Sequence, residues 1–446
     1  PAMPIWECVM RAAEQNEMMT RVGPGAPMGE LFRNYWIPFL PSSDLEIDGE
    51  PMRVRLLCED LVAFRDSEGQ VGLVDHACPH RGAPMLFARN EDCGLRCVYH
   101  GWKFHRSGET VDMPAEPETS RFKQKVRIKA YPCRERNGII WAWMGKDTPP
   151  SLPNFEWNMV PPENVVVTFR IQECNWLQAL EGEIDSAHAP LLHGRADAEG
   201  FVNQWRAAAD LRPAFDCVRQ DFGVSIASRR ANEVDSFYWR VNQFVLPFFT
   251  CVPPQSKFPE LSGHAWVPID DENTMAIMFS YRPDGPMYEK SRHVFLNGHK
   301  GRQAAHATHD VYEPKNRMEP YAKYWTKFNP GNTYNFNYAD QKSTYNSGLP
   351  GLWVQDAACQ SGVAPIYDRT QEHLAVSDTG IIATRRLLLE LAANYRDKGV
   401  KPPRVDDPDL YMVRAISVRL PKEASWLEQC RGYMQAELGK GFGYEP

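Results

Sequence analysis

The sequence contains no long apolar run, no cluster of basic residues and no repeated or low-complexity segment. A membrane-spanning helix needs about 20 consecutive apolar residues, so the first absence argues against a membrane protein. The first 23 residues carry Glu and Arg throughout, unlike a signal peptide. The formal net charge of −7 gives no electrostatic reason to expect a nucleic acid partner. A strand-linked G-x-G-x-x-G is missing as well, which argues against a bound flavin or nicotinamide and leaves small molecules and protein partners.

Cysteine is present, but not in the pattern of a disulfide-stabilised protein. Eleven cysteines, an odd number, are scattered over 446 residues, whereas small secreted domains have a dense and even set. We therefore expect reduced thiols and a cytoplasmic location. With 43% hydrophobic and 24% charged residues, the composition is that of a globular protein, and the length allows two or three hydrophobic cores.

Three parts of the chain differ in character. Residues 1–44 form a lead segment. Residues 45–150 contain short apolar or alternating runs separated by Gly, Asn, Asp and Pro, which is typical of a small all-β domain. Five prolines within residues 146–164 mark its end, because Pro cannot donate to a strand ladder. Residues 151–446 mix strand and helix patterns, so we expect an α+β fold; within them, residues 285–351 show little periodicity, as in a functional, oligomeric or mobile loop.

The densest group of metal-binding side chains lies in the all-β region, in two short motifs. Cys78 and His80 form C-x-H, Cys97 and His100 form C-x-x-H, and sixteen residues separate the two motifs. Each loop offers one thiolate and one imidazole, so the two loops can close on a single inorganic centre. Pro79 lies between the first two ligands and would stiffen its loop. The pattern predicts a site with two cysteine and two histidine ligands.

Two kinds of centre take these four ligands. Zinc accepts two thiolates and two imidazoles in structural sites, and the Rieske [2Fe-2S] cluster has two thiolates on one iron and two imidazoles on the other. A typical zinc finger groups its thiolates together and its imidazoles together, whereas here each loop provides one of each. The spacing therefore favours a Rieske cluster over a zinc site or a set of unrelated core residues. Cys93 falls outside the pattern and is interpreted as an ordinary thiol.

A second motif, D-x2-H-x4-H, follows in the α+β region at Asp185, His188 and His193. The first two residues share one face of a predicted helix with Glu181, whereas His193 is about 140° around the helix from His188. Pro190 would kink or end the helix and so allow both imidazoles to reach one ion. Two imidazoles and a carboxylate with open positions form the facial triad of non-haem Fe(II) oxygenases. A buried helix end with ordinary histidines is the alternative, and the upstream motif argues against it.

The two motifs together resemble those of the Rieske non-haem iron aromatic-ring oxygenases, large (α) subunit. Three further segments, residues 21–40, 174–193 and 368–386, are similar to the phthalate dioxygenase and aryl O-demethylase branch of that family. The likeness runs from about Arg21 to about Leu391. It implies an N-terminal all-β Rieske [2Fe-2S] domain and a C-terminal catalytic domain of the helix-grip type, which is an antiparallel sheet with helices.

For the cluster, the resemblance implies that Cys78 and Cys97 bind one iron and that His80 and His100 bind the other. It also implies a source of electrons. They would come from NAD(P)H through a separate flavin and iron-sulfur reductase.

For the catalytic iron, the resemblance implies His188, His193 and a later carboxylate, which matches Asp356. Asp185 matches the bridging acid of the catalytic site, which hydrogen-bonds an iron-ligating histidine on one side and a cluster histidine of a neighbouring subunit on the other. The two centres within one chain of this family are too far apart for direct electron transfer. The resemblance therefore implies a homotrimer or a dimer of trimers.

The implied activity is the use of O2 to hydroxylate an aromatic carboxylate by ring dioxygenation. A carboxylate buried near iron calls for a guanidinium, which binds it through two hydrogen bonds. Arg240 shares a strand face with Tyr238 and Asn242, and Arg206 follows the iron motif; a surface or structural role is the alternative for each. Aryl ether O-demethylation and diaryl-ether cleavage use the same iron ligands and remain open.

Two other classes of function also remain open: a Rieske electron carrier without a catalytic iron, and a zinc-binding interaction module. Both leave D-x2-H-x4-H unexplained. Glu181 stands where another branch of the family has Asn, which predicts either an additional carboxylate near iron or an ion pair on the helix surface. His373 matches a family pattern that carries no known ligand role, and a structural histidine is the favoured interpretation.

Overall fold

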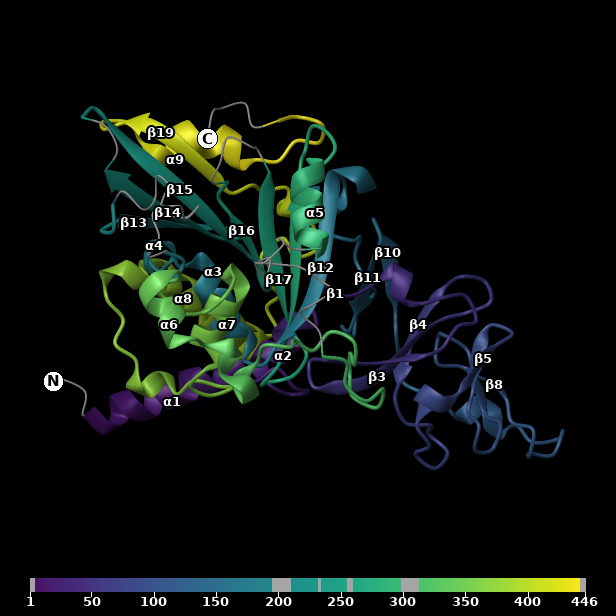
Figure 1. The fold of residues 1–446 in the computed structure, drawn as a ribbon. Helices are drawn as coiled ribbons and strands as arrows, with labels where there is room; N and C mark the ends of the chain where they lie inside the picture. Colours follow the sequence, from purple (N-terminus) through teal and green to yellow (C-terminus); the bar gives the residue numbers. More distant parts are fainter. Residues whose placement is uncertain (1–4, 195–209, 232–233, 255–259, 298–312, 442–446) are drawn as a thin grey trace.

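The protein is described by a computed structural model that covers residues 5–194, 210–231, 234–254, 260–297 and 313–441, with side chains from residue 12 onward. Small sheets occupy one side of the molecule, and a large sheet with most of the helices occupies the other (Figure 1). Within the described residues, no helix has the length and apolar character needed to cross a membrane.

Three small antiparallel sheets make up the N-terminal region. Their strand orders are β2-β3-β4-β9, β5-β6-β7-β8 and β1-β11-β10. The third sheet pairs β1 with β11, so the end of residues 1–44 lies beside the end of residues 45–150; the division of the chain at these points stays a prediction. The predicted all-β domain is confirmed. The strand bounds are β1 (Trp36–Pro41), β2 (Met52–Leu56), β3 (Glu59–Arg65), β4 (Val71–Asp75), β5 (Arg89–Glu91), β6 (Gly94–Arg96), β7 (Lys103–Phe104), β8 (Thr110–Asp112), β9 (Ala130–Tyr131), β10 (Cys133–Arg136) and β11 (Ile139–Trp143).

An eight-stranded antiparallel sheet forms the centre of the C-terminal region. Seven strands follow the order β12-β18-β17-β16-β15-β14-β13, and β19 pairs with the first part of β15. All eight residues of β18 are buried, so both faces of this part of the sheet are covered. The expected α+β fold with an antiparallel catalytic sheet is confirmed. The strand bounds are β12 (Val165–Gln172), β13 (Ala214–Gln220), β14 (Gly223–Ala231), β15 (Ser236–Val245), β16 (Phe249–Val252), β17 (Leu261–Pro268), β18 (Thr274–Tyr281) and β19 (Ile416–Pro421).

Most helices gather beside one face of the large sheet. Figure 1 shows α3, α4, α6, α7 and α8 grouped there, with α5 and α9 at other edges. The long helix α8 ends where Gly399 adopts a φ of +65°, a left-handed conformation that favours glycine. The helix bounds are α1 (Ile5–Thr20), α2 (Pro27–Phe32), α3 (Trp176–Ile184), α4 (Ala189–Leu192), α5 (Glu289–Asn297), α6 (Tyr338–Ser343), α7 (Leu352–Ser361), α8 (Thr379–Lys398) and α9 (Trp426–Met434).

The D-x2-H-x4-H motif lies at a break between two helices, and the first helix ends before Asp185 instead of at Pro190, where the pattern predicted a kink or an end. The side chain of Asn175 caps the start of α3 by accepting from the Leu177 N–H at 3.1 Å. The helix ends before Asp185, because the Asp185 carboxylate accepts from the Ala187 N–H at 2.7 Å and stabilises a turn. Pro190 then lies in the first turn of α4, where its missing N–H costs nothing. The proline therefore starts a second helix instead of kinking the first.

The aperiodic segment, residues 285–351, lies partly outside the described residues, at positions 298–312. Its last part supports α7. A small core there consists of side chains from residues 328–349 packed on the buried face of α7: Phe328, Tyr334, Leu349, Trp353, Val354 and Ala357.

Candidate functional site

Two loops of the all-β region present the predicted cluster ligands. Cys78 and His80 lie between β4 and β5, and Cys97 and His100 lie between β6 and β7. The two cysteines are buried, at 2% and 3% exposure, and the two histidines are half-buried. The loops thus bring all four side chains to one end of the domain.

The two loops have the same backbone fold. Each cysteine N–H donates to the carbonyl five residues later, at 2.9 Å to Ala83 in the first loop and 2.8 Å to Trp102 in the second. The residue four positions after each cysteine is a glycine whose N–H donates to the cysteine carbonyl. These glycines, Gly82 and Gly101, have φ values of +72° and +75°, which other residues rarely adopt. Two copies of one tight turn therefore present two matching pairs of possible metal ligands, one cysteine and one histidine in each.

The two cysteine and two histidine side chains are suited to binding a metal cluster. The His80 and His100 rings lie 4.5 Å apart at 70°, and the Cys97 thiol is close enough to Cys78 to raise the pKa of its thiol. Burial raises the pKa of the Cys78 thiol to about 11, and His80 Nδ1 is buried without a hydrogen-bond partner among the described residues. A buried thiol pair and an unpaired ring nitrogen are costly without a ligand, and metal coordination satisfies both.

The predicted iron ligands also come together. His188 Nε2 and His193 Nε2 each lie 3.4 Å from Asp356 Oδ1, and the two rings are 5.2 Å apart at 78°. One ligand atom from each residue falls within a group no wider than 4.8 Å, a spacing that a single metal ion can bridge. Asp356 reaches this position from the middle of α7, more than 160 residues later in the chain. The set has the composition of a two-histidine, one-carboxylate iron site.

The other nitrogen of each imidazole is held by a side chain behind it. His188 Nδ1 lies 3.4 Å from Asp185 Oδ2, and His193 Nδ1 lies 2.7 Å from Gln355 Oε1. Because these contacts hold a ring proton on Nδ1, the Nε2 atoms, which face Asp356, are the nitrogens that a metal ion would bind in place of a proton. This orientation is the one that metal binding through Nε2 requires.

The electrostatics of the group also fit a cation. Burial alone would lower the pKa of His188, but the carboxylates of Asp185 and Asp356 outweigh burial and raise it to about 10. Burial lowers the pKa of His193. The pocket of carboxylates around His188 therefore stabilises one positive charge, which a metal ion provides as well as a proton does.

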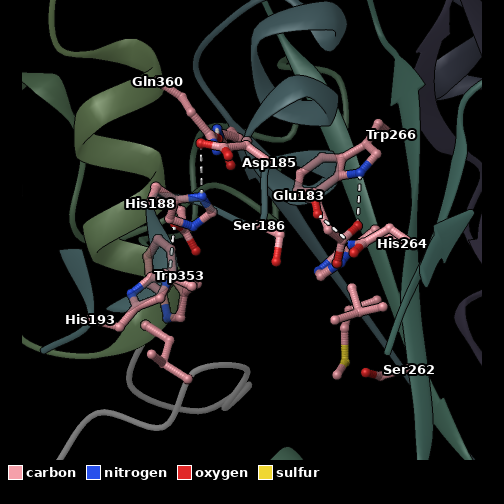
Figure 2. A pocket seen from close by; sticks show the side chains of 18 of the residues that line it. Glu183, Asp185, Ser186, His188, His193, Ser262, His264, Trp266, Trp353 and Gln360 are labelled. Atoms are coloured by element: carbon pink, nitrogen blue, oxygen red, sulfur yellow. Dashed lines mark hydrogen bonds and ion pairs between the residues drawn. The ribbon is translucent and has the colours of Figure 1, made fainter. Parts of the chain in front are cut away.

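A cavity of about 180 Å³ lies next to this group. Figure 2 shows its two walls: Asp185, His188, His193, Trp353 and Gln360 on one side, and Glu183, Ser262, His264 and Trp266 on the other. The first wall comes from α4 and α7 and the turn before α4. The second comes from the large sheet and the last turn of α3. A ligand in the cavity is therefore enclosed between the predicted iron ligands and a polar sheet surface.

Arg240, predicted to bind substrate, lines this cavity. It is 5% exposed and shares a strand face of β15 with Asn242, which also lines the cavity, as the period-two pattern predicted. Its Nη2 lies 3.3 Å from the Pro253 carbonyl. Arg206, the second candidate, lies outside the described residues. The substrate role of both arginines stays a prediction.

Glu181 does not face the cavity. It is buried under α8, where its carboxylate pairs with Arg369 at 3.1 Å and with Arg385 at 2.5 Å. Of the two interpretations, the ion pair agrees with the structure, but the pair is buried instead of lying on the surface. His373 is exposed, before the start of α8.

Several cavity residues could not be recognised as site residues from the sequence. Arg170 on β12, Glu183 on α3 and His264 on β17 are all buried or nearly so and line the cavity. One signal was present: the polar residues Thr168, Arg170 and Gln172 alternate with apolar residues in β12, which places them on one face of the strand. No short motif marks Glu183 or His264, because they meet only through the packing of α3 on the sheet.

Two protein families match most of the chain. The Rieske [2Fe-2S] domain matches residues 35–132, and the family described as "LigXa C-terminal domain like" matches residues 142–441. Together with the fold and the two groups of metal-binding side chains, these matches define a Rieske-type iron protein with a catalytic domain.

The relatives specify the class further. The 3-chlorobenzoate-3,4-dioxygenase oxygenase subunit of Comamonas testosteroni is 36% identical over 94% of this chain and 97% of its own length. The phthalate 4,5-dioxygenase oxygenase subunit of Pseudomonas putida is 35% identical over 87% of each chain. The 5,5'-dehydrodivanillate O-demethylase oxygenase subunit of Sphingobium sp. (strain NBRC 103272 / SYK-6) is 31% identical over 85% of this chain and 80% of its own. The chain belongs to the Rieske non-haem iron aromatic-ring oxygenases, as an oxygenase (α) subunit.

This membership confirms an oxygenase, and not an electron carrier or a zinc module, and it confirms the expected cofactors: a Rieske [2Fe-2S] cluster and a mononuclear iron, with electrons from a separate protein. A solved structure, the terminal oxygenase of carbazole 1,9a-dioxygenase from Novosphingobium sp. KA1, has the same fold. It is 19% identical, with a TM-score of 0.56 over 86% of this chain and 97% of its own.

Proposed function

We propose that this oxygenase hydroxylates an aromatic carboxylate by ring dioxygenation, with Arg240 holding the carboxylate. The observation that carries the proposal is the buried guanidinium of Arg240 in the wall of the cavity that borders the His188, His193 and Asp356 group. Two relatives, 36% and 35% identical over the aligned residues, act, by their names, on chlorobenzoate and on phthalate, which are both aromatic carboxylates.

The side chains around the cavity have separable tasks. When bound, the two metal centres supply the electrons and the oxygen chemistry. His188, His193 and Asp356 would hold the iron, and Arg240 would orient the ring by its carboxylate. Burial excludes water from the iron ligands and from Arg240, and the absence of water strengthens the pairing of a carboxylate with the guanidinium.

Oxidation at an aryl ether, with loss of one carbon or of a phenol, is the second candidate. It is favoured by the dehydrodivanillate O-demethylase among the relatives. Both reactions use the same iron ligands, so the ligand group does not separate them.

A single turnover separates the two candidates. We would expose chemically reduced enzyme to 18O2 with a panel of phthalates, phenoxybenzoates and methoxybenzoates, and read the products by mass. Two labelled atoms in one product are expected for ring dioxygenation. One labelled atom, with release of formaldehyde or a phenol, would replace this proposal with the ether-oxidation reading.

The role of Arg240 is tested by Arg240→Gln, which keeps the size of the side chain but removes its charge. Because a hydrogen bond to a charged group is worth about 1.5–3 kcal/mol, we expect KM for the carboxylated substrate to rise by about tenfold to a hundredfold. The matched control is Arg219→Gln, which removes a half-exposed guanidinium from β13 of the same sheet. An unchanged KM in the first variant contradicts the assignment.

A further inference from the structure

Arg170 is a second buried cation in the cavity wall. It lies on β12, is 7% exposed, and faces Ala276 across the strand pair with β18. Because Ala276 is small, the arginine side chain can cross over β18 and reach β17, where its Nη2 lies 3.3 Å from His264 Nε2. Its guanidinium carbon is 5.6 Å from the ring centroid of Trp353 on α7. The cation therefore spans the space between the sheet wall and the helix that carries Asp356.

Arg170 lines the same cavity as the predicted iron ligands His188, His193 and Asp356. Its guanidinium therefore lies in the space where a substrate ring must sit to be next to those ligands.

His264 is held from behind by Glu183. Its Nδ1 lies 2.6 Å from Glu183 Oε1, while the other oxygen of that carboxylate accepts from Trp266 Nε1 at 3.1 Å and from the Thr250 hydroxyl. The His264 ring also stacks on Trp266, with centroids 4.5 Å apart at 20°. The Glu183 carboxylate, itself held by Trp266 and Thr250, and the stacked Trp266 ring together fix the orientation of the His264 imidazole.

These contacts also select a tautomer. With the proton on Nδ1, His264 donates to Glu183 and its Nε2 accepts from Arg170, so both contacts are hydrogen bonds. With the proton on Nε2, a donor would face the guanidinium, which has no acceptor. Glu183 therefore sets the direction of the hydrogen bond that His264 makes to Arg170.

We propose that Arg170 is an anion-binding and specificity-determining residue of the cavity, and that Glu183 is a positioning residue that acts on it through His264. The inference rests on the proposed function, because the anion is the carboxylate of the aromatic substrate. The cavity lining carries two guanidinium groups, Arg170 and Arg240, and three carboxylates. Each carboxylate is paired with a histidine: Asp185 and Asp356 with His188, and Glu183 with His264. The two guanidinium groups are therefore the cavity groups that attract a substrate carboxylate, and they favour an anionic ligand over a neutral one of the same shape.

Binding can be measured apart from turnover. We would titrate the intact oxygenase under nitrogen with 3-chlorobenzoate and phthalate, and with 3-chlorobenzamide and phthalamide as neutral analogues, by isothermal titration calorimetry. For Arg170→Gln we expect the Kd of the acids to rise by about tenfold to a hundredfold and that of the amides to change by less than about twofold. Arg219→Gln, the control outside the cavity, leaves all four unchanged.

Glu183→Gln tests the positioning step. Because the Trp266 indole can only donate, the amide oxygen stays on that side, and the amide NH2 then faces His264 Nδ1. The ring proton moves to Nε2, towards Arg170, and the acids bind more weakly by about tenfold. The double variant with Arg170→Gln should bind the acids no more weakly than Arg170→Gln alone, since the two act in series.

The outcomes separate the two levels of the argument. If the native enzyme binds none of the acids, the proposed function fails and this inference fails with it. If the acids bind but Arg170→Gln leaves the ratio of acid to amide affinity unchanged, only the inference is wrong. If that variant loses its cluster absorbance, Arg170→Lys is compared instead; a point charge without the planar fork should still weaken the acids selectively. Multiplying losses in the double variant would contradict the role of Glu183.

Discussion

His188 and His193 use their two ring nitrogens for different purposes. In each, Nδ1 meets a supporting side chain and Nε2 faces Asp356. The histidines and Asp185 could be predicted, because their spacing is a recognisable pattern. Gln355 could not, because glutamine carries no metal-site signal and its contact exists only once α7 lies beside α4.

Replacing Asp356 by Ala should remove the mononuclear iron and leave the cluster. Two imidazoles alone form an incomplete set of ligands, so we expect the iron content to fall from about three per chain to about two, with the visible absorbance of the cluster retained. The control is Cys359→Ser, an exposed residue on the same helix. Loss of the cluster absorbance in Asp356→Ala would instead indicate a folding defect.

The support of His193 is testable in the same way. Gln355→Leu keeps the volume of the side chain but removes the acceptor 2.7 Å from Nδ1. Partners behind a metal-binding histidine typically contribute tenfold to a hundredfold in metal affinity. We expect a loss of that size in an iron-chelator competition, and an unchanged affinity would mean that the hydrogen bond does not orient the ring.

At the scale of elements, the break between α3 and α4 positions the iron motif. A straight helix would point the two histidines apart, and the turn made by Asp185 removes that constraint. The break needs a rigid α3 to be useful. Glu181 provides it, because its carboxylate joins α3 to Arg369 and to Arg385 of α8 inside the protein.

Replacing Glu181 by Gln should therefore destabilise the catalytic domain. Arg369 would lose its buried counter-charge and Arg385 would keep only Glu372, a change that costs about 3 kcal/mol in the free energy of unfolding. The control, Glu390→Gln, breaks a half-exposed pair with Arg219 and should cost less than about 1 kcal/mol. Urea denaturation at pH 7 compares the two, and equal midpoints would contradict the role given to Glu181.

The effect of Glu181→Gln should depend on pH. Burial raises the pKa of Glu181, but Arg369 and Arg385 outweigh it and lower the pKa below the ordinary value of 4.5. A carboxylate with a depressed folded-state pKa stabilises the protein above its unfolded pKa, and this contribution is lost as pH falls through the folded pKa. The difference in unfolding free energy between native and variant should thus be full at pH 7 and shrink below about pH 4.5. A constant difference would mean that the charge is not its source.

At the scale of the whole molecule, the two metal-binding groups lie at different ends of the chain's fold. Figure 1 shows the sheet of β5 and β8 at the far side from α4 and α7. Beside the cluster loops, Val98 and Tyr99 are more than half exposed. Asp185 borders both the inner cavity and an outer hollow that is lined by Leu191 and Cys359. An exposed apolar rim at one centre and an acid reaching the surface at the other are suited to contact between subunits.

We therefore expect a particle of about three or six times the 51.0 kDa chain mass in light scattering.

A mixing experiment tests the electron path directly. Cys97→Ala chains lack a complete cluster site and Asp356→Ala chains lack a complete iron site, so each is expected to be inactive alone. Co-expressed chains should regain turnover if electrons pass between neighbouring subunits. If the mixed assemblies are as inactive as the pure ones, electrons pass within one chain.

Local patterns in the sequence predicted the all-β and α+β regions, the four proposed cluster ligands and the D-x2-H-x4-H motif, because each depends on residue types a few positions apart. The family resemblance added Asp356, which is too far along the chain for spacing to place. Tertiary structure alone decided that α3 ends at Asp185, that Glu181 is a buried ion pair, and that Arg170, Glu183 and His264 form one wall. Those contacts join β12, α3 and β17, and packing, which has no short-range signature, brings them together.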